Sequence, residues 1–142
     1  MAASIGLTLS IAVAVLARWT GLDRDRAFYA TVTMVVASYY VLFAVVGGST
    51  HALVVETMVM GLFVAAAVVG FRSRRWLIAG ALAVHGAFDA VHGQLLTNPG
   101  VPVWWPAFCG AYDIGAAAWL ALLWRHDTRR LARHPVCHAP AR

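Results

Sequence analysis

The sequence contains no lysine, and charged residues of either sign are scarce. Charged side chains make up 12% of the 142 residues, about half the share that is usual in soluble domains. Hydrophobic residues account for 61%. These proportions exclude an ordinary soluble domain. The apolar residues do not alternate with polar ones, which also excludes a membrane β-barrel.

Every basic residue is an arginine, and the basic excess does not indicate nucleic-acid binding. The chain has 11 arginines against six acidic residues, a net charge of +5. The arginines lie in short clusters between apolar runs, and no nucleic-acid-binding motif accompanies them. This spacing is typical of the loops of a membrane protein. We therefore expect a lipid bilayer, and no nucleic acid, as a partner.

Cysteine is also rare, and two residues cannot build a disulfide framework. Cys109 and Cys137 fall on opposite sides of the membrane in the topology proposed below. We do not expect them to pair.

Five apolar runs are each long enough to cross a hydrocarbon core of about 30 Å as a helix. Lipid offers no hydrogen-bond partners to the backbone. Each run is therefore predicted to be helical, because a helix satisfies its backbone hydrogen bonds internally. The first run has no basic residues before it, which favours a retained span over a cleaved signal peptide. The prediction is an all-α bundle of five transmembrane helices in residues 1–124, followed by a basic cytoplasmic tail in residues 125–142. The predicted spans are 2–19, 27–46, 51–71, 76–96 and 107–124.

The arginines predict the orientation of this bundle. They follow the first, third and fifth spans, whereas the loops after the second and fourth spans contain none. The positive-inside rule then places the N-terminus outside and the C-terminus in the cytoplasm. Trp19, Trp76 and Trp124 adjoin arginines at the inner surface, and Trp104 and Trp105 mark the outer one. Tyr39, Tyr40 and Tyr112 are interpreted as interfacial tyrosines of the same kind.

Ionisable side chains inside the fourth span indicate a functional site. His85, Asp89 and His92 stand at i, i+4 and i+7, so they share one face of a helix. Charge at membrane depth is unfavourable and marks a functional site by default. From the helix rise, Asp89, His92, Glu56 and Asp113 fall roughly 6 to 10 Å below the outer surface, with His85 at about 16 Å. Three of the six acidic residues thus meet in the outer half of the bilayer.

Three carboxylates at close range cannot all remain ionised without a compensating charge. Protonation of a carboxylate would remove part of this negative charge, and a cationic histidine or a bound metal would compensate it. Imidazole and carboxylate ligands fit zinc, with iron and manganese as alternatives, and helical bundles build such sites from inward-facing residues. We predict His85, Asp89, His92 and Asp113 as metal ligands, and Glu56 as a further ligand or as a general base.

Other interpretations of these residues stay open. The polar cluster could fix helix packing without any metal. Cys109 stands one turn before Asp113 and could offer a thiolate, but a small buried hydrophobic residue is the favoured interpretation. The pairs of small residues formed by Gly86 with Ala90 and by Ala111 with Gly115 are interpreted as close helix contacts.

Three motifs in the second half of the chain resemble those of an uncharacterised family of small bacterial integral-membrane proteins. They are His85-Gly-Ala-Phe-Asp89-Ala-Val-His92, then Asn98-Pro99-Gly-Val-Pro102, then Cys109-Gly-Ala-Tyr-Asp113. The likeness covers residues 83–119, and Glu56 is similar to an acidic position in the preceding helix of that family. Gly93 and Tyr112 replace a histidine and a cysteine of the family pattern, which speaks against a thiolate-rich or two-metal site. The resemblance implies a multi-pass protein of the bacterial cytoplasmic membrane, and no activity.

Three functions are compatible with these features. The first is a metal-binding membrane protein, with metal-dependent hydrolysis of a lipid or another apolar substrate as its activity. The second is an accessory or structural subunit of a homo-oligomer or a larger membrane complex, in which the cluster fixes packing or contacts a partner. A proton or metal-ion conduit is the weakest, because no ionisable residue continues a path through the inner half of any span.

Overall fold

The computed structural model describes residues 1–24 and 26–133, with side chains up to residue 126. The described chain is helical and contains no strand, which confirms the predicted fold class. Four of the five long helices are long and apolar enough to cross a membrane. The exception is α4, because three ionisable residues of the site lower its hydropathy. The elements are α1 (Ala2–Thr20), the short 3₁₀ helix η1 (Leu22–Arg24), α2 (Ala27–Val46), α3 (Thr50–Arg72), α4 (Trp76–Leu95) and α5 (Trp105–Arg133).

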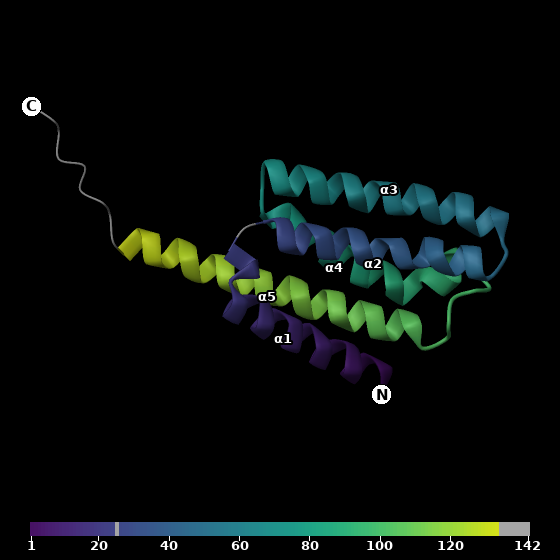
Figure 1. Ribbon diagram of the computed structural model, residues 1–142, viewed down its shortest axis with the longest axis horizontal. Coiled ribbons are helices and arrows are strands. Elements are labelled where there is room, and N and C mark those ends of the chain that lie inside the picture. The colour runs from purple at the N-terminus through teal and green to yellow at the C-terminus, as the bar shows by residue number, and fades with distance from the viewer. Residues whose placement is uncertain (25, 134–142) are drawn as a thin grey trace, which may run out of the picture.

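Successive helices run in alternating directions, so the arginine-bearing segments gather at one end of the bundle (Figure 1). Arg26 at the start of α2 donates hydrogen bonds to the carbonyl oxygens of Phe71 and Ser73, at 3.3 and 3.2 Å. Arg75 at the start of α4 lies over the ring of Trp124 in α5, 5.5 Å from its centre. The basic loops therefore form one surface, as the topology requires.

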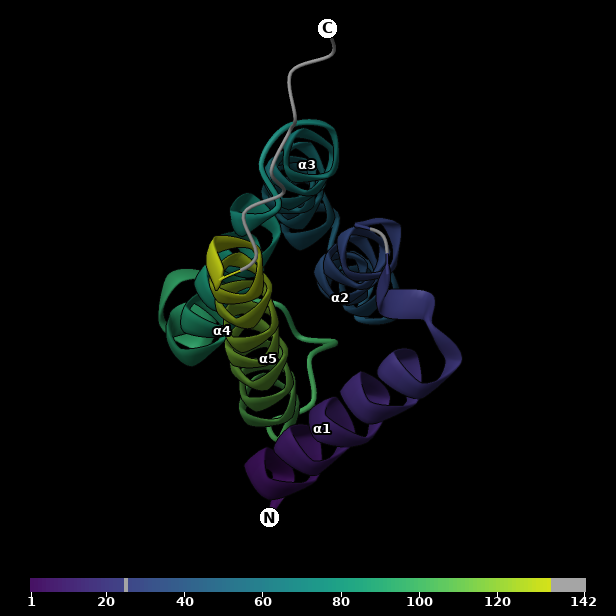
Figure 2. The ribbon, with the colours of Figure 1, turned by 90° about the vertical axis from the view of Figure 1, so that its left-hand side faces the viewer.

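The first helix lies against α5 and crosses the direction of the other helices (Figure 2). Its buried face consists only of small residues, Gly6, Ser10, Ala14 and Ala17. A Cβ on Gly6 would overlap the carbonyl oxygen of Phe108. Small side chains let two backbones approach closely in lipid, where van der Waals contact rather than water exclusion holds helices together.

A second close approach joins α4 to α5 at the level of the site. A Cβ on Gly86 would lie 2.9 Å from the carbonyl oxygen of Gly110, and one on Gly110 would lie 3.3 Å from Cβ of Asp89. Gly115 also lies in close contact, with Ser10 of α1. The expectation of close helix packing is confirmed for Gly86 and Gly115, whereas Ala90, the predicted companion of Gly86, is exposed.

The connection between α4 and α5 folds back onto the end of α2. A Cβ on Gly47 would lie 2.5 Å from the backbone nitrogen of Gly100, and one on Gly100 would overlap the carbonyl oxygen of Phe43. This tight contact carries Asn98, which is buried, into the bundle. A loop that the sequence indicated only as a turn thus contributes one buried side chain, Asn98, to the protein interior.

The last helix is longer than predicted at both ends. It begins at Trp105 and continues to Arg133, whereas residues 107–124 were expected. Pro106 is tolerated because the first turn of a helix needs no backbone donor. Half of the predicted tail is therefore helical. Residues 134–142, including Cys137, lie outside the described part of the chain.

Candidate metal centre

The ionisable residues of α4 all point into the bundle. His85, Asp89 and His92 are each no more than 2% exposed, as expected for residues on one face of a helix. Glu56 of α3 and Asp113 of α5 are buried as well, at 1% and 0%. Three helices thus bring all five predicted site residues into the interior.

Four side chains from α4 and α5 form one compact group, which we call the metal centre: His85, Asp89, Cys109 and Asp113. Each offers a ligand atom, and these atoms all lie within 4.8 Å of one another. His85 Nδ1 is hydrogen-bonded to Asp113 Oδ2 at 2.6 Å and lies 3.8 Å from Asp89 Oδ2. The thiol of Cys109 lies 3.8 Å from Asp113 Oδ2. The group could hold a metal ion.

The fourth member of the metal centre differs from the predicted ligand set. The sequence pointed to His92 and favoured an apolar role for Cys109. In the structure Cys109 joins the group, because it stands one helical turn before Asp113 and faces the same way. His92 lies one turn beyond Asp89 and bonds to another carboxylate.

The carboxylate that His92 contacts belongs to Glu56. Glu56, His92 and Asn98 form a polar network next to the metal centre. His92 Nε2 and Glu56 Oε1 are 2.7 Å apart. The Asn98 side-chain amide donates to the same Glu56 oxygen at 3.1 Å and to the backbone oxygen of Tyr40 at 3.0 Å. Among the described residues, Glu56 makes no hydrogen bond to the metal centre.

Tyr40 of α2 connects the two polar groups, which corrects its interpretation as an interfacial tyrosine. It is 2% exposed. Its hydroxyl donates to Asp89 Oδ1 at 2.7 Å, and its ring stacks on His92 with 4.0 Å between ring centres. Sequence reasoning missed this residue because its role depends on how α2 packs against α4.

Several buried oxygens of the site have no hydrogen-bond partner. They are Asp89 Oδ2, Asp113 Oδ1 and Glu56 Oε2. Buried polar atoms in folded proteins are nearly always satisfied. In the described part of the chain, the only basic side chains within ion-pair distance of these carboxylates are histidines, which carry a charge only when protonated. The metal centre therefore contains carboxylate oxygens that have no hydrogen-bond donor, and little positive charge to compensate them.

The donor set of the metal centre fits a zinc ion. One imidazole, two carboxylates and one thiolate are ligand types that zinc accepts. Tetrahedral zinc with bonds of about 2.0 to 2.3 Å separates its ligand atoms by roughly 3.3 to 3.8 Å. The ligand atoms lie within 4.8 Å of one another, so zinc binding would require the side chains to adjust, and His85 Nδ1 would have to move apart from Asp113 Oδ2, which is 2.6 Å away. The proton shared by His85 and Asp113 would leave on binding, as is general for metal sites.

The fold and the site define a class of protein: a helical membrane bundle with a buried cluster of metal-ligating side chains. Comparisons with protein-family models, with characterised proteins and with solved structures found no match for the chain. The residues of the site are therefore the only indication of function.

Proposed function

We propose that this chain is a metal-binding integral membrane protein that holds one divalent ion, with zinc favoured, between α4 and α5. The observation that carries the proposal is the metal centre with its unpartnered carboxylate oxygens on Asp89 and Asp113. Iron and manganese are the alternatives, although a thiolate from Cys109 favours zinc over manganese.

The activity we propose is hydrolysis of a lipid or another apolar substrate. A bound zinc ion would supply Lewis-acid chemistry and make a water molecule more acidic. Glu56 is the proposed general base. Its Oε1 is fixed by His92 and Asn98, which leaves Oε2 unpartnered and available to accept a proton.

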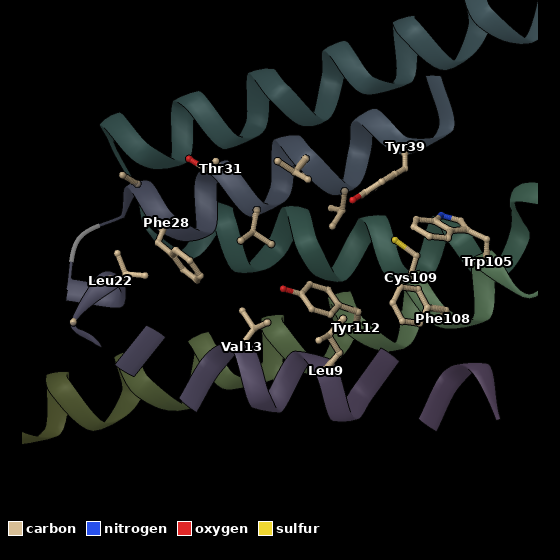
Figure 3. Close-up of a pocket in the computed structure, with 15 residues that line it drawn as sticks. Leu9, Val13, Leu22, Phe28, Thr31, Tyr39, Trp105, Phe108, Cys109 and Tyr112 are labelled. Carbon is tan, nitrogen blue, oxygen red and sulfur yellow. The ribbon is translucent and has the colours of Figure 1, made fainter. Parts of the chain in front are cut away.

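A large apolar cavity adjoins the metal centre and supports an apolar substrate. It measures about 780 Å³ and lies between α1, α2 and α5, in the upper range for small-molecule sites. Cys109 belongs both to the cavity wall and to the metal centre. Figure 3 shows Leu9, Val13 and Phe28 along the cavity, with Cys109 and Trp105 near one end of it. An acyl chain in this space would reach the site from the side of Cys109.

The metal claim is tested by elemental analysis of the detergent-purified full chain after loading with zinc. We expect about one zinc per chain in the wild type and loss of zinc in Asp113→Asn and Cys109→Ala. Asp23→Asn is the matched control, because Asp23 is an equally buried carboxylate that lies outside the metal centre. A wild type without stoichiometric metal would remove the proposal. Loss of zinc in His92→Gln but not in Cys109→Ala would restore the ligand set predicted from the sequence.

The hydrolytic claim needs its own assay. The loaded protein is given a palmitoyl ester that releases a chromophore. We expect Glu56→Gln to lower the rate roughly 10²- to 10⁴-fold, as for loss of a general base, while zinc content stays unchanged. Turnover that survives this substitution would exclude Glu56 as the base.

A second candidate function is an accessory subunit whose buried pairs fix helix packing. The short contacts favour it, because they connect α4 to each of three neighbours: Tyr40 of α2, Glu56 of α3 and Asp113 of α5. Purification from native membranes with fixed partners, together with no metal, would support this alternative. Under either function we place the arginine end in the bacterial cytoplasm, which fusion of a reporter enzyme to each terminus would test.

A further inference from the structure

A polar pocket lies at the arginine end of the bundle, and none of its lining residues belongs to the metal centre. Its volume is about 300 Å³, at the lower end of the range for small-ligand sites. Side chains from α1, η1, α2, α4 and α5 converge on it. The polar members are Arg18, Asp23, Arg24, Arg26, Tyr29 and Arg75.

The pocket carries an excess of positive charge. Four arginines line it, and Asp23 is the one carboxylate among the described lining residues, which leaves an excess of +3. Asp23 Oδ2 lies 3.5 Å from Arg18 Nη1. One arginine is thus compensated, and three face the pocket without a carboxylate from its described lining.

Two of these arginines are held in place by contacts that leave most of their donors free. Arg26 uses one nitrogen for its two backbone acceptors, and Arg75 is held by the ring of Trp124. A guanidinium group has five N–H donors in a fixed fork. The fork matches the oxygens of a phosphate group and suits it better than an ammonium does.

Tyr29 supplies an independent indication of a ligand. It is 3% exposed, and its hydroxyl has no hydrogen-bond partner although it lines the pocket. A buried hydroxyl is nearly always satisfied. A phosphate oxygen in the pocket would accept from it.

We propose that this pocket binds a phosphate group, and that its source is the headgroup of an anionic phospholipid in the leaflet at the arginine end. Trp19 and Trp76 beside the pocket are exposed, as residues at a membrane interface are. Basic pockets between membrane helices bind anionic headgroups at this depth. This proposal does not depend on the metal centre.

The test measures binding to the full chain in detergent, by native mass spectrometry with phosphatidylglycerol or phosphatidylcholine and by calorimetry with inorganic phosphate. We expect phosphatidylglycerol to bind about tenfold more tightly than phosphatidylcholine, because both offer a phosphate but only phosphatidylcholine also brings a cationic choline to a pocket with an excess of positive charge. The double variant Arg24→Gln/Arg75→Gln should lose this preference. Tyr29→Phe should weaken binding several-fold while it leaves all four arginines and the buried ring in place.

Arg74→Gln is the matched control, because Arg74 is exposed, neighbours Arg75 and does not line the pocket. It should bind phosphatidylglycerol within twofold of the wild type. Inorganic phosphate that binds with the same dependence on Tyr29 would support the phosphate site and identify a soluble anion as its ligand. Equal binding of phosphatidylglycerol and of phosphate to the wild type and to both pocket variants would overturn the proposal, as would an equal loss in Arg74→Gln.

Discussion

Substitution of Gly86 by alanine adds one methyl group between α4 and α5. It tests whether the metal centre depends on the close packing of these two helices. His85, the neighbour of Gly86, and Gly110, its contact in α5, both lie at the level of the site. In Gly86→Ala the new Cβ would lie 2.9 Å from the Gly110 carbonyl oxygen and 3.0 Å from Ile114 Cγ1, where ordinary contact requires 3.4 Å or more. The two helices would have to separate by about half an ångström.

Overpacking of this kind costs about 1 to 3 kcal/mol of unfolding free energy. The same substitution at Gly80 or Gly93 gives two controls on the same helix, because nothing lies within 4 Å of a Cβ at either position. Both controls should be neutral or should stabilise by up to about 1 kcal/mol, since alanine favours a helix over glycine. The gap between Gly86→Ala and its controls should thus be about 1 to 4 kcal/mol.

Unfolding in mixed detergent, followed by circular dichroism, measures this gap, and zinc titration measures its effect on the site. Gly86→Ala should also bind zinc more weakly than its controls, because His85 and Asp89 of α4 would move away from the α5 ligands. If Gly86→Ala is as stable as Gly80→Ala, then α4 and α5 do not touch as described. If stability falls and zinc affinity does not, then the ion is not held between these helices.

Two further predictions concern other contacts. Tyr40→Phe removes only the hydroxyl that donates to Asp89, so zinc affinity should fall about 10- to 100-fold in a titration while the fold is retained; an unchanged binding curve would show that this hydrogen bond does not support the site. Gly6→Ala should destabilise by roughly 1 to 3 kcal/mol because its methyl would overlap the carbonyl oxygen of Phe108. Gly61→Ala, which faces open space, should not, and equal unfolding curves for the two variants would contradict the close contact of α1 with α5.

Helix periodicity and membrane depth were sufficient to predict much of the site. The i, i+4 spacing of His85 and Asp89 requires a shared face, and equal depth on antiparallel helices brings Asp113 to the same level. Cys109 lies four residues before Asp113 and therefore shares its helix face. The sequence favoured an apolar role for Cys109, because a cysteine in an apolar run is usually a small hydrophobic residue. Only the side chains around it in the structure identify it as a possible ligand.

Tyr40 and Asn98 could not be predicted in this way. Each acts through a contact between segments that are distant in sequence: Tyr40 reaches Asp89, and Asn98 reaches Glu56. Such contacts depend on which faces of α2 and α3 turn toward α4 and on how the loop before α5 folds back. Uniformly apolar helices give no one-sided pattern from which those rotations could be read. The orientation in the membrane likewise stays a prediction from the arginines.

The pairing of α1 with α5 has a consequence for how the protein is made. α1 finds its chief partner in α5, which is synthesised only after α2, α3 and α4. Until then the α1 face of small residues, including Gly6 and Ser10, must be shielded by lipid or by the insertion machinery. Truncation before Trp105 would therefore leave α1 inserted but unassembled, open to the quality-control proteases of the membrane.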